Sequence, residues 1–476
     1  MVNIRCICVY VSDVVGKRRR RREEQRSAKD LTCDYTNVLQ RNLSKVYMKR
    51  AIRPRYEPVN LNLASILPDS EKNHLDRYGY VISHLYEVRF LDNRWKELKR
   101  RSKKARKKQF TQLNAVILRR ILDKRHSRRI LRNLCDWDIL EANNQYIVGK
   151  KSRSYRLTAK YADSEFRSVD YGRKFSDRLD RFESEGRATH LPSLHKEIAE
   201  QIERNFTIDM DVANKLMQKL RLDRLTAIRA KLALDRMKKG DFGHSVSGKT
   251  GRYFNHLINL KRELRQAIVC KDGSKLVDVD IANSQPFFLS VFLACIEREV
   301  ADVMKVAEEL KVDIRSLPKV STEKEFKHFT QLTGSGTFYD YFCRKTGLTR
   351  GVVKDKMIQT FFKPMHYTTP FEEEFRKLFP KIIEVFKLLK PKGAHNKLAL
   401  LLQRIESLVV IETLCDLMIV EEIPFIPIHD GVLVPRRYAA GVARVIRDTS
   451  YYYSRLKPSV RIKTLKGKEV VPRQRK

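Results

Sequence analysis

Residues 276–280 read LVDVD, a run of apolar and β-branched side chains that ends in an aspartate. Such a run favours a strand, and the following residues 281–286, IANSQP, break the pattern before an apolar stretch typical of a helix. A carboxylate at the tip of a buried strand loses hydration, so it is costly unless a positive charge compensates it. A divalent cation is the natural compensator, and this stretch therefore predicts a metal ligand at Asp280.

A second aspartate follows another strand-like stretch far along the chain. Residues 423–434 read IPFIPIHDGVLV, which predicts a strand that delivers Asp430, a tight turn at Gly431 and a returning strand. Asp280 and Asp430 would then lie side by side on neighbouring strands. Two such carboxylates can hold two Mg²⁺ ions roughly 3.5–4 Å apart, as in-line phosphoryl transfer requires. The alternative for each aspartate alone is a hairpin-turn or helix-capping role.

Cationic and aromatic side chains recur between the two aspartates. Residues 350–362 read RGVVKDKMIQTFF, in which Arg350 and Lys354 are four positions apart and share one face of a helix. Two cations and an aromatic ring on one helix suit a nucleoside triphosphate, because the cations can hold its phosphates and the ring can stack on its base or sugar. An amphipathic helix with snorkelling basic side chains is the alternative.

The chain is strongly basic. Its 476 residues include 98 Lys and Arg against 57 Asp and Glu, a formal net charge of +41, which indicates a polyanionic partner. No stretch approaches the roughly 18 consecutive apolar residues of a spanning helix, so we expect no integral membrane protein, and a membrane surface is the rival polyanion. The eight cysteines are scattered without a CxxC, which indicates a reducing compartment inside the cell, the cytoplasm or the nucleoid.

Charge and apolar periodicity predict four regions along the chain. We expect a basic flexible arm over residues 1–33 and a basic nucleic-acid-binding region over 34–160. A linker with thumb-like helices would follow over 161–242, and an α+β domain would occupy 243–476.

The basic region carries the outline of a winged helix at residues 112–157. Apolar residues recur at helical spacing through 113–121, a second short helix follows, and a hairpin comes next. In such a module the basic helix enters a groove and the wing contacts phosphates. A solvated basic helix beside an ordinary hairpin is the alternative. The hairpin tip supplies three cations, Lys150, Lys151 and Arg153.

A set of motifs resembles the palm and fingers of family A DNA polymerases, the DNA polymerase I type. The motifs occur along this chain in the same order as in that family. Residues 247–252, SGKTGR, are similar to the family's T-x-x-G-R element, and the strand that ends at Asp280 resembles the one that carries its first catalytic aspartate. Residues 350–362 are similar to the fingers motif R-x3-K-x7-Y, and residues 429–435, HDGVLVP, resemble the last motif, H-D-E before an apolar strand. The resemblance covers about residues 243–468, and single-subunit phage-type RNA polymerases share this scaffold.

The resemblance implies a right-hand polymerase fold, with an antiparallel palm sheet that carries the two aspartates and with helical fingers and thumb. Asp280 and Asp430 would bind two Mg²⁺ ions, which Mn²⁺ could replace, and Lys354 would act in catalysis by protonating the leaving pyrophosphate. The other implied contacts fall into two groups: nucleotide or primer-terminus binding by Arg350, Phe362, Gln285 and His429, and primer–template binding by Arg252, Arg262 and Gln403.

Two departures from the family limit what the resemblance implies. The run after Asp280 lacks the family's glutamate that helps to exclude ribose, so the choice of sugar stays open. No constellation of three carboxylates upstream suggests a proofreading exonuclease. We therefore expect a template-directed nucleotidyl transferase, first a DNA polymerase of the kind a plasmid or other mobile element would carry. The alternatives are a single-subunit RNA polymerase and a non-catalytic basic replication protein with a degenerate polymerase fold.

Overall fold

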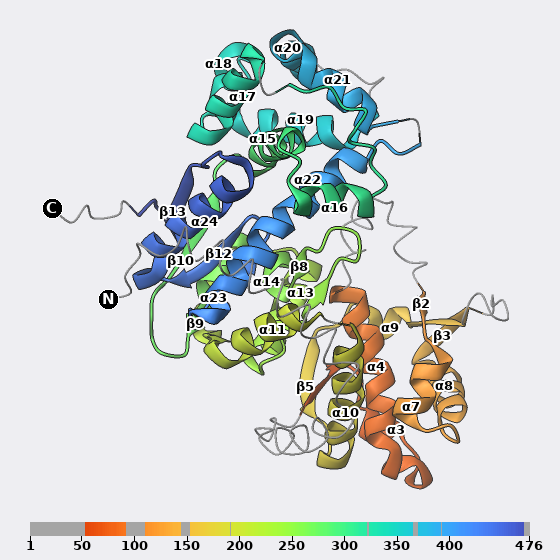
Figure 1. The fold of residues 1–476 in the computed structure, drawn as a ribbon. Helices are drawn as coiled ribbons and strands as arrows, with labels where there is room; N and C mark the ends of the chain where they lie inside the picture. The colour runs from red at the N-terminus through yellow and green to blue at the C-terminus, as the bar shows by residue number, and fades with distance from the viewer. Residues whose placement is uncertain are drawn as a thin grey trace, which may run out of the picture. The chain divides into compact units, whose positions relative to one another are not determined.

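The computed structural model describes residues 53–91, 110–143, 153–190, 192–320, 323–364, 370–391 and 393–470. The described chain divides into two compact units (Figure 1). The N-terminal unit contains residues 53–190 and 207–242, and the C-terminal unit contains 192–206 and 243–470. Both units combine helices with small antiparallel sheets, so the predicted α+β class is confirmed.

The N-terminal unit has two small sheets. Strands β1 and β5 pair antiparallel, and a second sheet has the order β2-β4-β3, also antiparallel. Its elements are β1 (Pro54–Pro58), α3 (Leu63–Ile66), η3 (Asp69–His74), α4 (Leu75–Leu91), β2 (Thr111–Gln112), α7 (Ala115–Leu122), α8 (Ser127–Asp136), β3 (Leu140–Asn143), β4 (Ser154–Leu157), α9 (Ala159–Ala162), β5 (Phe166–Asp170), α10 (Arg173–His190), α12 (Met210–Lys219) and α13 (Arg224–Lys238). Strand β6 (Phe206–Ile208) spans the boundary between the units.

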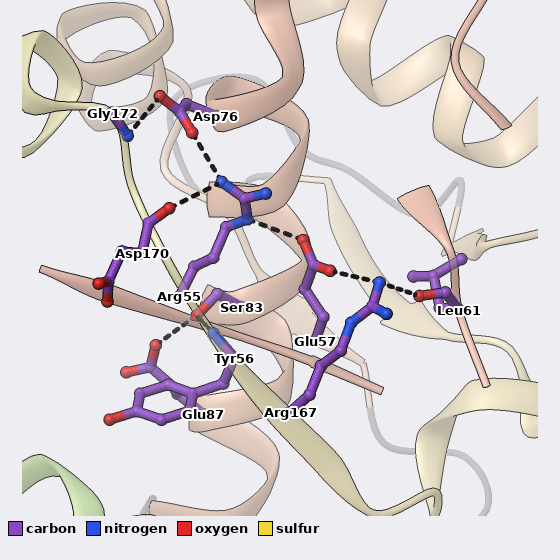
Figure 2. A network of polar contacts seen from close by, with 10 residues as sticks. All are labelled: Arg55, Tyr56, Glu57, Leu61, Asp76, Ser83, Glu87, Arg167, Asp170 and Gly172. Carbon is purple, nitrogen blue, oxygen red and sulfur yellow. Dashed lines mark hydrogen bonds and ion pairs between the residues drawn. The ribbon is translucent and has the colours of Figure 1, made fainter. Parts of the chain in front are cut away.

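A buried ion network ties β1 to its neighbours in this unit (Figure 2). Arg55 donates from Nε to Glu57 Oε1 at 2.7 Å and from Nη1 to Asp76 Oδ1 at 2.7 Å. Gly79 on α4 makes room for this arginine, since a Cβ there would lie 2.6 Å from Arg55 Cδ. Arg167 on β5 supplies a second cation to Glu57, at 3.1 Å. Because buried charges need close partners, we assign this network to holding β1, α4 and β5 together.

Residues 161–242 were expected to form a linker followed by thumb-like helices, but the start of this range is not a linker. Residues 166–170 form β5 and residues 173–190 form α10, and Phe166, Phe175 and Leu179 are buried in the core of the N-terminal unit. The polar composition hid these elements, because only one apolar residue per turn or per strand faces inward. The rest of the range contains the helices α11 (Ser193–Asn205), α12 and α13 and the short strand β6, and the two units share it.

The C-terminal unit is built around one four-stranded antiparallel sheet of order β11-β12-β10-β13 (Figure 1). Helix α24 packs on β10 and β13, and α15 packs against α24. Its elements are α11 (Ser193–Asn205), β7 (Ser245–Val246), β8 (Tyr253–Phe254), α14 (His256–Asn259), η4 (Arg262–Ala267), β9 (Ile268–Cys270), β10 (Leu276–Ile281), α15 (Ser284–Glu297), α16 (Ala301–Glu309), α17 (Lys324–Ser335), α18 (Phe338–Thr346), α19 (Arg350–Phe362), α20 (Pro370–Leu378), α21 (Pro380–Leu389), α22 (Lys397–Ser407), the π-helical η5 (Leu408–Cys415), α23 (Asp416–Val420), β11 (Ile426–Ile428), β12 (Gly431–Pro435), η6 (Arg436–Tyr438), α24 (Ala439–Ser454) and β13 (Val460–Thr464).

The central strand β10 has two chemically different faces. Val277, Val279 and Ile281 are buried, whereas Asp278 and Asp280 alternate with them on the opposite face and are half-buried. This period of two is what a strand imposes on its side chains. The sheet therefore presents two carboxylates, two residues apart, on one face. Among the described helices, none is both long and apolar enough to cross a membrane.

Candidate active site

The structure places Asp280 on β10 and Asp430 in the loop that leads into the adjacent strand β12. Asp280 on β10 pairs with Gly431 on β12, and the amide nitrogen of Ile281 donates to the carbonyl oxygen of Asp430 at 3.4 Å. Ile428 pairs with Gly431, so His429 and Asp430 form a two-residue hairpin loop, in which His429 has a φ of +53°. The sequence predicted the turn at Gly431, but in the structure the turn lies just before this residue.

Gly431 is required by close packing of the backbone. A Cβ at this position would lie 2.4 Å from the carbonyl oxygen of Val279 and 2.9 Å from the Cα of Asp280. Distances below 3.0 Å to backbone atoms force a shift of the chain. The absence of a side chain at residue 431 is therefore what lets the loop of Asp430 approach the end of β10.

The carboxylates of this sheet form one electrostatic cluster. Burial, followed by the charges of Asp280 and Asp430, raises the pKa of Asp278 to about 6, while Lys463 and Arg262 act in the opposite direction. A like charge raises a carboxyl group's pKa only when it is near, so Asp280 and Asp430 both lie close to Asp278. A cation bound among these side chains would relieve the repulsion on Asp278.

Lys463 is a site residue that the sequence did not reveal. Strand β13 pairs with β10 on the side opposite β12, with Lys463 facing Asp278 in the register. Its Nζ lies 3.2 Å from Oδ1 and 3.1 Å from Oδ2 of Asp280. Strand pairing across about 180 residues leaves no local signal in the sequence, so no pattern near Lys463 could have predicted this contact.

Glu406 on α22 is a second residue that the sequence did not reveal, and it is 1% exposed. Arg252 binds its Oε1 from Nε at 2.9 Å and from Nη2 at 2.6 Å, and Gln285 donates to its Oε2 at 2.6 Å. Burial, aided by the charge of Asp430, raises the pKa of Glu406 to about 7 against the opposing effect of Arg252 and the hydrogen bonds. The residues predicted to contact primer–template and substrate, Arg252 and Gln285, thus both hold this carboxyl group.

Tyr339 on α18 is near both Arg350 and Asp430. Arg350, the first residue of α19, forms an ion pair with Asp340, and its guanidinium carbon lies 5.4 Å from the centre of the Tyr339 ring. Burial first and the charge of Asp430 second raise the pKa of Tyr339, while Arg350 opposes this shift. Tyr339 is therefore the described residue that connects the start of α19 with Asp430.

Other predicted residues are less closely connected to the aspartates. Lys354 is exposed one turn further along α19, and no hydrogen bond or ion pair within the described ranges joins it to Asp280 or Asp430. Phe362 is 40% exposed, while its neighbour Phe361 packs inside the unit. The remaining predicted residues occupy three positions: His429 in the hairpin loop, Gln403 half-buried on α22, and Arg262 exposed but near enough to lower the pKa of Asp278.

Asn283 lies three residues beyond Asp280 and has an unusual environment. It is 6% exposed, its φ is +53°, and it precedes the first residue of α15. Neither polar atom of its side chain has a hydrogen-bond partner among the described residues. Buried polar groups are rarely left unpaired, and such exceptions often mark places where a ligand or solvent binds. In the sequence, Asn283 lies within the run 281–286, which breaks the strand pattern before the helix begins.

The side chains at the sheet suit a hard divalent cation. Asp280 and Asp430 supply carboxylate oxygens, the donors that Mg²⁺ prefers, and Mg²⁺ commonly takes one or two protein carboxylates while keeping several waters. In the described part of the chain no group of three or more His, Cys, Asp or Glu could hold a metal. Asp280 and Asp430 together would offer the carboxylate oxygens that Mg²⁺ or Mn²⁺ takes.

Comparison with known proteins assigns no family to the chain. A search of protein-family models finds none that matches, and a search of curated proteins finds no significant sequence match.

Proposed function

We propose that the C-terminal unit is a template-directed nucleotidyl transferase, and specifically a Mg²⁺-dependent DNA polymerase. The observation that carries this proposal is the pairing of β10 with β12, which sets Asp280 beside the loop of Asp430. The position of Arg350, which shares Tyr339 with Asp430, supports it. In this proposal the four-stranded sheet is the palm and α19 belongs to the fingers.

The proposed division of labour follows from charge and position. Asp280 and Asp430 would hold the divalent cations, which when bound lower the pKa of a 3′-hydroxyl and neutralise the leaving pyrophosphate. Arg350 would bind the triphosphate. Lys354, on the same helical face, would donate a proton to the departing pyrophosphate. Positioning and charge stabilisation are the main sources of rate enhancement in phosphoryl transfer.

The nucleic acid would be bound largely by charge. Arg262 lies on η4 near Asp278, which places an exposed cation beside the carboxylate cluster. Arg252 is held against Glu406, so its guanidinium has a fixed position. With a net charge of +41, we expect primer–template affinity to fall steeply as salt increases.

Primer extension with Mg²⁺ tests the proposal. We expect extension of a primed DNA template by the full chain, and a loss of at least about 100-fold in rate in Asp280→Asn and in Asp430→Asn, since each removes a ligand of the cations that stabilise the transition state. Asp302→Asn is the matched control, because Asp302 is exposed on α16 in the same unit. Extension at the wild-type rate by both site variants would exclude this mechanism.

The two alternatives each have an observation in their favour. The absence of a glutamate in the run after Asp280 leaves ribonucleotides as substrates, and parallel assays with ribonucleotides and deoxyribonucleotides separate an RNA polymerase from a DNA polymerase. The ion pair of Lys463 with Asp280 would suit a non-catalytic protein whose site is neutralised permanently. If the protein binds nucleic acid but extends no primer in Mg²⁺ or Mn²⁺, the result would favour the non-catalytic alternative.

A further inference from the structure

The N-terminal unit contains a helix-turn-helix arrangement beside a small sheet. Helix α7 ends at Leu122, residues 123–126 turn the chain with a φ of +81° at Asp123, and α8 follows. The two helices lie in sequence between β2 and β3, which join β4 in the three-stranded sheet (Figure 1). All of these elements belong to the N-terminal unit, whereas Asp280 and Asp430 belong to the C-terminal unit.

Helix α8 is divided sharply into a buried face and a cationic face. Ser127, Ile130 and Leu134 are buried, and Asn133 fixes the helix to α4 by donating to the hydroxyl of Tyr78 at 2.7 Å. The outward face carries three exposed arginines, Arg128, Arg129 and Arg132.

Basic side chains gather where η3 and α4 meet α8 and α10. We call this group the basic cluster, and it consists of His74, Arg77, His126, Arg129 and Arg178. The rings of His74 and His126 lie 4.4 Å apart. His74 Nδ1 accepts a hydrogen bond from Arg77 Nη1 at 3.0 Å, and His126 Nδ1 accepts one from Arg129 Nη2 at 3.0 Å. Arg178 is anchored by donating to the carbonyl oxygen of Arg120 at 2.8 Å.

The basic cluster is incompletely neutralised by the acids around it. Burial first, and then the neighbouring cations, lower the pKa of both His74 and His126. Burial, Arg178 and Arg129 also lower the pKa of Arg77. The opposing acids are Glu71, which pairs with Arg129 at 3.1 Å, and Asp123. Among the described residues, three arginines and two histidines of the basic cluster face these two carboxylates, which leaves arginine donors for an anion.

We propose that the cationic face of α8 and the basic cluster form a docking site for double-stranded DNA, with α8 in the major groove and the cluster on the phosphate backbone. A helix is about 10–12 Å across with its side chains, which matches the major groove of about 12 Å in B-form DNA. The second helix of a helix-turn-helix reads base edges there. Double-stranded RNA fits poorly, because its major groove is deep and narrow.

Fluorescence anisotropy of the full chain on a blunt-ended DNA duplex in EDTA, without nucleotides, tests this site separately from catalysis. We expect Arg128→Ala/Arg132→Ala to weaken binding by about 10-fold or more and to reduce the slope of log K against log salt by one to two units. The control is Lys215→Ala/Lys219→Ala, which removes the same charge from exposed positions on α12 of the same unit. Circular dichroism verifies that each variant is folded.

Sequence selection from a random duplex pool gives a second, independent readout. We expect the wild type to enrich a motif and Arg128→Lys/Arg132→Lys to lose it while keeping its non-specific affinity, because lysine keeps the charge but not the bidentate geometry of arginine. Equal losses in the α8 and α12 variants would overturn the proposal. Tighter binding to the matching RNA duplex or to anionic phospholipid vesicles would overturn it as well.

Discussion

Asp280 faces Gly431 across β10 and β12 so closely that a Cβ on Gly431 would lie 2.9 Å from the Cα of Asp280. This contact explains why glycine follows Asp430 in the hairpin between β11 and β12. The aspartate occupies the hairpin loop, and the glycine allows that loop to approach the carboxylate-bearing end of the neighbouring strand. The geometry of the proposed metal pair thus depends on a residue that itself has no side chain.

Gly431→Ala tests this dependence. The added methyl group must displace the backbone of β10 or β12, so we expect a loss of about 1–3 kcal/mol of unfolding free energy and a large fall in primer extension. Gly441→Ala is the control, because a Cβ on Gly441 in α24 meets nothing within 4 Å and alanine favours a helix. Thermal unfolding and extension rates are the measurements. Full activity in Gly431→Ala would show that the approach of the two strands is not needed.

Lys463→Met should make the aspartates bind divalent cations more tightly. Lys463 already neutralises Asp280 at 3.1 Å, so a cation must compete with its ammonium group. We expect the Kd for Mn²⁺ to fall several-fold, and we expect no change in Lys466→Met, which removes an exposed charge just after β13. Isothermal titration calorimetry measures both. An unchanged or higher Kd in Lys463→Met would mean that the lysine does not compete with the metal.

Glu406→Gln should change how stability depends on pH. Burial raises the pKa of Glu406 to about 7 from a usual value of 4.5, so the folded protein retains a proton that the unfolded chain releases. The stability contributed by the neutral acid is complete below pH 4.5 and is lost as the pH rises to 7, by on the order of 3 kcal/mol.

Urea denaturation followed by circular dichroism from pH 4 to 8 measures this effect. The wild type should lose stability relative to Glu406→Gln across that window, whereas Glu421→Gln, at an exposed position, should track the wild type. A constant difference between the wild type and Glu406→Gln would show that Glu406 ionises normally.

Lys354→Ala and Lys356→Ala distinguish two lysines of α19. Lys354 shares a helical face with Arg350, whereas Lys356 lies about 200° around the helix from Lys354. We therefore expect Lys354→Ala to slow single-turnover extension by about 100-fold or more, the scale of proton-transfer catalysis, and Lys356→Ala to remain near the wild-type rate. The reverse order of effects would assign the role to Lys356.

The strand that carries Asp280 and the strand that precedes Asp430 were predictable because their signals are local. The alternation in 276–280 and the apolar run before Asp430 each specify a strand without reference to the rest of the chain. The helix at 350–362 was predictable from its spacing, and its observed bounds agree. The turn was placed one position late, because glycine usually marks the turn itself, whereas here it accommodates the neighbouring strand.

The partners of the aspartates were not predictable, because they come from distant segments. Lys463 reaches Asp280 through the pairing of β13, and Glu406 reaches Arg252 and Gln285 from α22. Neither contact leaves a periodic pattern in the sequence. Of the apolar residues at helical spacing in 113–121, Leu113 and Ile121 are buried, whereas Val116 and Ile117 are 64% and 42% exposed. Leu118 and Leu122 supply further buried contacts. The expected arm at 1–33 and the hairpin-tip residues Lys150 and Lys151 lie outside the described residues, whereas Arg153 is described and exposed.

The central claim is that Asp280 and Asp430 together hold a divalent cation. Mn²⁺ titration monitored by electron paramagnetic resonance tests it most directly, with the wild type, Asp280→Asn, Asp430→Asn and the control Asp302→Asn. We predict that each site variant binds Mn²⁺ at least about 10-fold more weakly, because each loses one of two carboxylate ligands, and that the control binds as the wild type does. Wild-type Mn²⁺ affinity in both site variants would contradict the claim.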